Sequence, residues 1–131
     1  MKDVAVTRIE PFCVGSEDAS VTLRCGTTEI VVFSFGRLLH LGNPVREPLS
    51  ALDCDVRAAY LEDWPEDVKS ELGRDRIEAT SWPYGYRGCG RVVDQDNGII
   101  EVLGFFIDVG ELDFVWPGAP VEFDCIRLDL R

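Results

Sequence analysis

A hairpin signal around Asn97-Gly98 constrains the fold of this chain most strongly. Two runs rich in β-forming residues, 91–93 and 99–103, flank this dipeptide. Asn-Gly tolerates the two positive φ angles of a type I′ turn, which is a preferred connection in β-hairpins. The sequence therefore predicts a hairpin here, and the later run 120–130 predicts a strand that lies against it. We expect the last third of the chain to be a meander with short connections.

Runs that alternate apolar and polar residues between glycines and prolines predict further strands. These runs lie at residues 4–9, 21–25, 29–35, 52–60 and 76–82. The run 52–60 also fits one face of a helix, and we choose the strand. Residues 65–72 predict one short helix, because Pro65 stands at its start, acids occupy its first turn and Gly73 follows it.

The apolar phase of the last run switches after Cys125, which indicates a bulge or a strand that moves from one buried face to another. About seven or eight short strands with one helix predict a mainly β protein, a small antiparallel barrel or sandwich of the partly open Greek-key kind. The 131 residues suit a single domain, 1–131. In the last third, the order of GRVV, GIIEVLGFFI and GAPVEF resembles cold-shock and related barrels. This architectural resemblance implies an OB-like barrel and assigns no family.

The chain is strongly acidic, with a formal net charge of −11 and a pI near 4.4. A field of this sign disfavours nucleic-acid binding through a broad surface, because phosphates are held by clustered Lys and Arg. The acids either keep the protein soluble or form a face that docks a basic partner. No apolar run reaches the roughly 20 residues that span a bilayer, and the start lacks the apolar core of a signal peptide. We therefore expect a cytoplasmic protein.

Metal, redox and histidine chemistry find little support in the sequence. The five cysteines are odd in number and form no CxxC pair, so we predict reduced, structural thiols and no zinc site. The single histidine, His40, lies in an apolar run, 37–41, and is predicted to be a core or edge residue of a strand end. The segment 94–98 departs from the EF-hand pattern, because glycine is fifth and Phe105 stands twelfth. We predict no metal and no cofactor.

All three tryptophans precede a proline, at Trp64, Trp82 and Trp116. Residues before proline favour extended geometry, and such bonds can be cis, so these side chains should lie at element boundaries. They either cover the open ends of a barrel or serve as exposed anchors for a partner. Large aromatics and arginines also gather in the only basic stretch, which contains Trp82, Tyr84, Tyr86, Arg87 and Arg91.

Three functions from different classes remain open. The first is a non-enzymatic acidic interaction domain, of the inhibitor or immunity type, that binds a basic protein partner. Its binding residues would be aromatic anchors, among them Trp116, and the acids Glu111, Asp113, Glu122 and Asp124. The second is a small-ligand or single-stranded nucleic-acid binding barrel that works through the basic stretch. The third is an enzyme that uses Asp53 and Asp55, which would project from the same face of a strand.

Overall fold

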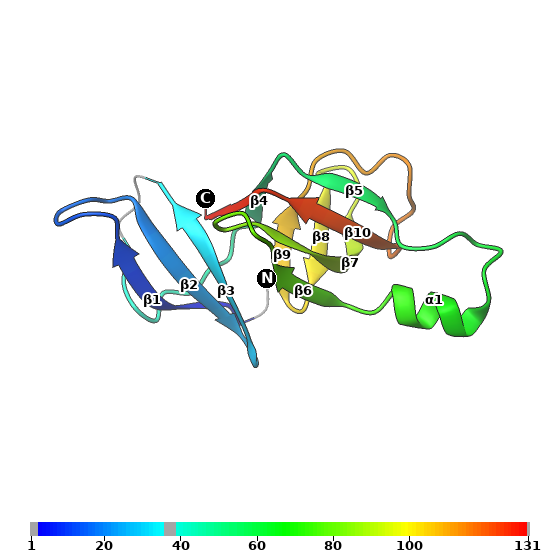
Figure 1. The fold of residues 1–131 in the computed structure, drawn as a ribbon, viewed down its shortest axis with the longest axis horizontal. Coiled ribbons are helices and arrows are strands. Elements are labelled where there is room, and N and C mark those ends of the chain that lie inside the picture. The colour runs from blue at the N-terminus through cyan, green and yellow to red at the C-terminus, as the bar shows by residue number, and fades with distance from the viewer. Residues whose placement is uncertain (1–2, 36–38, 131) are drawn as a thin grey trace.

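The computed structural model describes residues 3–35 and 39–130, and these form a mainly β fold with one short helix (Figure 1). This confirms the predicted class. The elements are β1 (Ala5–Pro11), β2 (Ala19–Cys25), β3 (Thr28–Ser34), β4 (Leu49–Leu52), β5 (Asp55–Ala58), α1 (Glu66–Leu72), β6 (Arg76–Ala79), β7 (Tyr86–Asp94), β8 (Ile99–Val102), β9 (Phe105–Asp108), β10 (Pro120–Cys125) and β11 (Arg127–Leu130). No helix among the described residues is long and apolar enough to cross a membrane.

The strands belong to one sheet that runs in the order β1-β2-β3-β11-β4-β9-β8-β7-β10-β5, with β6 paired to β7. Within the described residues this path does not return from β5 to β1, so the sheet is not closed into a barrel, and the predicted barrel or sandwich is not confirmed. The ribbon of β1, β2 and β3 lies at one end of the molecule and α1 lies at the other (Figure 1).

The last third of the chain is a Greek key rather than the expected meander. Strands β7, β8 and β9 are joined by hairpins, and the connection 109–119 then returns the chain so that β10 pairs with β7. A fourth strand that lies beside the first is the defining order of this motif. After Cys125 the chain leaves these neighbours, and β11 pairs with β3 and β4 instead. The predicted switch of apolar phase marks this change of partners.

The hairpin around Asn97-Gly98 exists, but its predicted type I′ turn is wrong. Four residues separate β7 from β8, and in this dipeptide only Gly98 has a positive φ, +69°. Asp94 shapes the turn, because its carboxylate accepts hydrogen bonds from the backbone N–H of Asn97 (3.1 Å) and from its Nδ2 (2.8 Å). These bonds lower the pKa of Asp94. The two positive φ angles of a type I′ turn occur at Leu103 and Gly104, between β8 and β9.

The predicted strand 52–60 is interrupted. Asp53 has a φ of +48° and ends β4, and β5 then pairs with a different neighbour, β10. A side chain in this left-handed region breaks the extended geometry that a continuous strand needs. The predicted short helix is confirmed as α1, with Pro65 at the N-cap and Gly73 at the C-cap.

The prediction that His40 is a core or edge residue of a strand end is wrong. Residues 36–38 of the expected strand end lie outside the described residues, and Leu39 to Leu41 form no strand. His40 is exposed next to a turn, where its backbone N–H donates a hydrogen bond of 2.8 Å to Oδ1 of Asn43. The flanking leucines therefore do not place this histidine in the core. No cis peptide bond occurs among the described residues, so the three Trp-Pro bonds are trans.

Candidate functional site

The aromatic residues of the basic stretch lie in different environments in the structure. Tyr86 is only 7% exposed, and its hydroxyl accepts a hydrogen bond of 2.7 Å from the backbone N–H of Val31. Burial raises the pKa of Tyr86. Tyr84 has a φ of +63°, and its hydroxyl is hydrogen-bonded to the hydroxyl of Ser20. Trp82 is 59% exposed. Tyr86 is therefore a core residue, and only Trp82 is an open aromatic surface in this stretch.

Arg87 and Arg91 lie on the opposite face of β7 from Tyr86, because side chains alternate along a strand. Nε of Arg87 is 2.9 Å from Oε1 of Glu78, and Nε of Arg91 is 3.7 Å from Oδ1 of Asp75. Both guanidinium groups thus have an acidic partner. The five residues of the stretch do not form one binding surface.

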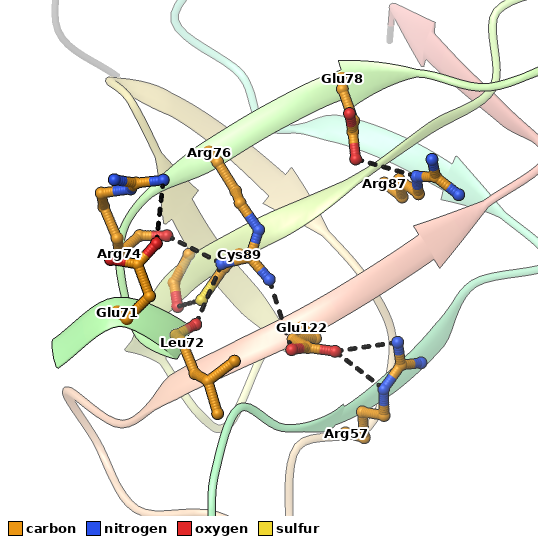
Figure 2. A network of polar contacts seen from close by, with 10 residues as sticks. Arg57, Glu71, Leu72, Arg74, Arg76, Glu78, Arg87, Cys89 and Glu122 are labelled. Atoms are coloured by element: carbon orange, nitrogen blue, oxygen red, sulfur yellow. Dashed lines mark hydrogen bonds and ion pairs between the residues drawn. The ribbon is translucent and has the colours of Figure 1, made fainter. Parts of the chain in front are cut away.

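The outer face of β5, β6, β7 and β10, which we call the charged face, is built from two rows of side chains in register. The first row is Arg76, Cys89, Glu122 and Arg57; the second row is Glu78, Arg87, Asp124 and Asp55. Figure 2 shows Glu122 between two arginines. Its Oε2 lies 2.9 Å from Nη2 of Arg57, and its Oε1 lies 3.3 Å from Nη2 of Arg76.

The charged face fits the outer surface of a sheet better than a reactive site. Burial raises the pKa of Cys89, the thiol in the first row, which leaves it a weak nucleophile. The carboxylates proposed for catalysis are not on one strand, because Asp53 lies in the bend after β4 whereas Asp55 lies in β5. Both are exposed. They form no enclosed acid–base pair, so the structure gives the enzyme hypothesis no support.

The 109–119 loop, which connects β9 to β10, is anchored by buried side chains and by hydrogen bonds to its backbone. Leu112, Val115 and Ala119 are buried in the core. The side-chain Nε2 of Gln95 donates hydrogen bonds to the backbone carbonyls of Leu112 (3.1 Å) and Val115. Two backbone bonds to Val92 then fix the end of the loop beside β7, with lengths of 2.8 and 3.0 Å. The backbone of this loop is therefore anchored at several points.

The same loop turns large aromatic and acidic side chains outward. Phe114 is 51% exposed and Trp116 is 50% exposed, although each has a buried residue beside it in sequence. Glu111 and Asp113 are also exposed. With Asp96 from the β7–β8 turn, these two acids line an open hollow of about 450 Å³. We take this outward surface of Asp96, Glu111, Asp113, Phe114 and Trp116, here called the loop surface, as the candidate functional site.

Sequence reasoning found most of the loop surface. It selected Trp116 as an aromatic anchor and Glu111 and Asp113 as acids of a binding face. It missed Asp96, which comes from a different connection, and it missed Gln95 as the internal support. A polar residue in a turn gives no sequence signal for the carbonyls that it will meet about 20 residues later.

A second open hollow, of about 520 Å³, lies between α1 and the sheet. Its cations already have acidic neighbours. Nζ of Lys69 is 3.4 Å from Glu66 and 3.8 Å from Glu62, and it also lies over the ring of Tyr60. Arg91 is the neighbour of Asp75, as described above. This hollow therefore offers no concentrated positive charge for an anionic ligand.

Within residues 3–35 and 39–130, no three His, Cys, Asp or Glu side chains lie close enough together to hold a metal ion. Comparisons of the chain with protein-family models, with curated proteins and with solved structures find no match. The candidate site therefore rests on its own geometry.

Proposed function

We propose that this protein is a cytoplasmic, non-enzymatic interaction domain that binds a basic protein partner through the loop surface. One observation carries the proposal: Phe114 and Trp116 are half exposed on a loop whose backbone is anchored from beneath. Aromatic side chains of this kind supply much of the binding energy at protein interfaces. An anchored loop also loses little conformational freedom on binding, which favours affinity.

The charge of the molecule supports a basic partner. Glu111 and Asp113 precede the aromatics in the loop, and Asp96 lines the same hollow as these two acids. The whole chain adds a field of formal charge −11. Such a field speeds the encounter with a positively charged protein and disfavours acidic competitors. Masking of a basic partner, as an inhibitor or immunity protein does, fits these features.

The test is an affinity pull-down from extract of the native cells, with quantitative mass spectrometry of the eluted proteins. We expect a basic protein that is released by salt and whose recovery falls at least about tenfold with Trp116→Ala, as for a central interface aromatic. The double variant Glu111→Lys/Asp113→Lys should weaken capture most at low salt. The matched control is Glu17→Lys/Glu47→Lys, which makes the same charge change at exposed positions on other connections.

The proposal fails if no basic protein is enriched over the tag alone. It also fails if Trp116→Ala and Glu111→Lys/Asp113→Lys recover the partner as well as the original protein and the control variant do. Trp82→Ala separates the two aromatic surfaces, because Trp82 is exposed to a similar degree but lies outside the loop surface. Loss of the partner with this variant alone would move the site to the β6–β7 connection.

A second candidate is a small-ligand or single-stranded nucleic-acid binding domain of OB-like architecture, and one observation favours it. The rings of Phe12, Phe33, Phe35 and Tyr84 form a cluster with centroids 5.5 to 6.5 Å apart. The guanidinium of Arg127 lies 4.6 Å from the ring centroid of Phe33, so a cation and aromatic planes are adjacent. Binding of labelled oligonucleotides at low salt, lost with Phe33→Ala, would support it, and absence of binding would eliminate the nucleic-acid form.

A further inference from the structure

Two cysteines far apart in sequence meet where the ladder between β5 and β10 ends. The last register pair of these antiparallel strands is Asp55 with Asp124, and the next residue on each strand is a cysteine. Continuing the register by one residue places Cys54 opposite Cys125. On the far side of this pair, the backbone N–H of Ile126 donates a bond of 3.1 Å to the carbonyl of Leu52. The two cysteines are therefore enclosed between backbone contacts on both sides.

The hydrogen-bond pattern of the ladder indicates that the pair is closely spaced. The backbone N–H of Ala59 donates to the carbonyl of Pro120, which makes this a hydrogen-bonded pair. Because hydrogen-bonded and non-hydrogen-bonded pairs alternate, the position of Cys54 and Cys125 is of the non-hydrogen-bonded kind. Cα atoms at such positions are about 4.5 Å apart, within the range of roughly 4.4 to 6.8 Å that disulfides span.

The two thiols also shift each other's pKa. Hydrogen bonding between them lowers the pKa of Cys125 and raises the pKa of Cys54. Cys125 is fully buried, whereas Cys54 is partly exposed. The pair thus combines one thiol that a reagent from solution can reach with a second thiol directly behind it.

We propose that Cys54 and Cys125 are a redox modification site that forms an intramolecular disulfide on reaction with a small-molecule disulfide such as oxidised glutathione. Before the first step Cys125, whose pKa is lowered, loses its proton to solvent. In the first step Cys54 attacks one sulfur of the reagent while its thiol proton passes to the Cys125 thiolate, and this forms a mixed disulfide and releases one glutathione thiolate. In the second step Cys125 gives that proton to the released glutathione thiolate and attacks the sulfur of Cys54, which releases the second glutathione as a thiolate that takes up a proton from solvent. Two electrons pass from the protein to the reagent, and in the net balance the two thiol protons end on the two glutathione molecules.

In the strand pairings of the described residues, none of the other three cysteines faces a second cysteine. Cys25 is opposite Thr28, and Cys89 is opposite Arg76 on one side and Glu122 on the other. Cys13 is exposed on the connection between β1 and β2. The proposal therefore makes a specific prediction: a single internal disulfide that ties β5, at the end of the sheet path, to β10.

The test treats the folded protein with excess oxidised glutathione, blocks the remaining thiols with iodoacetamide and measures the intact mass and a tryptic map. We expect two fewer alkylated thiols and a linked pair of peptides, 47–57 with 92–127. Each of these peptides contains one cysteine, and Cys89 lies outside both. Cys54→Ser should abolish the linked pair, whereas Cys13→Ser and Cys89→Ser should retain it. Circular dichroism confirms that each variant is folded.

The disulfide should also disappear on return to reduced glutathione, with recovery of both alkylation sites. A stable glutathione adduct on Cys54 without a link to Cys125 would overturn the proposal, as would a link that involves any other cysteine. Failure of either thiol to react, in a folded protein whose Cys13 does react, would overturn it too. None of these outcomes depends on the partner-binding role of the loop surface.

Discussion

The charged face and the loop surface are both rich in acids, but they use them in different ways. On the charged face, register places Glu122 between Arg57 and Arg76 and places Glu78 beside Arg87 (Figure 2). On the loop surface, among the described residues, no ion pair engages Asp96, Glu111 or Asp113. On the charged face the arginines are paired with Glu122 and Glu78, and on the loop surface the acids have no such partner.

The two surfaces are stabilised by different contacts. The charged face is stabilised through the very side chains that it exposes, so a partner that recruited them would have to break existing ion pairs. The loop surface is supported by what lies beneath it, namely Leu112, Val115 and the amide of Gln95. In the part of the chain that the structure describes, the side chains of Asp96, Glu111 and Asp113 form no hydrogen bond or ion pair, and they are therefore available for recognition.

The largest effect should come from Gly98→Ala, which places a methyl group against the backbone of the 109–119 loop. Gly98 has a φ of +69°, and an added Cβ would overlap the backbone carbonyl oxygen of Gly110. Its own carbonyl accepts the N–H of Val109 at 2.9 Å. Because backbone must move and the conformation disfavours a side chain, we expect a loss of at least about 3 kcal/mol in the free energy of unfolding, measured by urea denaturation.

Gly118→Ala is the matched control for this change. Gly118 also has a positive φ, +84°, but nothing lies within 4 Å of the added Cβ. Only the conformational cost of roughly 1 kcal/mol applies. Equal losses for the two variants would show that the contact between Gly98 and Gly110 does not hold the loop.

These contacts mark the boundary of what the sequence could predict. Hairpins were predictable, because β-rich runs around short glycine-containing turns are local signals. The placement of Tyr86 and Arg87 on opposite faces of β7 also follows from local sequence, since adjacent residues in a strand point to opposite faces. The turn type at Asn97-Gly98 was mispredicted because the carboxylate of Asp94 competes for the backbone of the turn.

Contacts that depend on topology were beyond prediction. Arg57 and Glu122 are 65 residues apart and meet only because β5 pairs with β10. Cys54 and Cys125 meet for the same reason, although each lies in a run of the sequence that alternates apolar and polar residues. The loop was predictable from Pro117 and Gly118, but not its support, because Gln95 reaches it only after the chain has turned back beside β7.

A smaller effect is expected from Gln95→Ala. This change removes the donor from two carbonyls, those of Leu112 and Val115, while it leaves the apolar anchors in place. Loss of hydrogen bonds to partly buried carbonyls costs about 1 to 2 kcal/mol. We expect this decrease in stability together with faster hydrogen exchange in residues 109–119. Asp96→Ala, an exposed neighbour, should stay within about 0.5 kcal/mol, and an equal loss there would contradict the proposed role of Gln95.

The smallest effects are expected from removing one acidic side chain from each surface, Glu122 from the charged face and Glu111 from the loop surface. Glu122→Ala leaves Arg57 and Arg76 without their shared partner, and because this carboxylate is mostly buried between them we expect a loss of about 1 kcal/mol that shrinks at high salt. Glu111→Ala removes a charge that has no such role. At low salt it should leave stability within about 0.5 kcal/mol, or raise it slightly, because it relieves repulsion in a chain of net charge −11. Urea denaturation of both variants at two salt concentrations compares them directly. If Glu111→Ala destabilised the protein as much as Glu122→Ala does, the acids of the loop surface would be structural, and their availability for a partner would no longer follow.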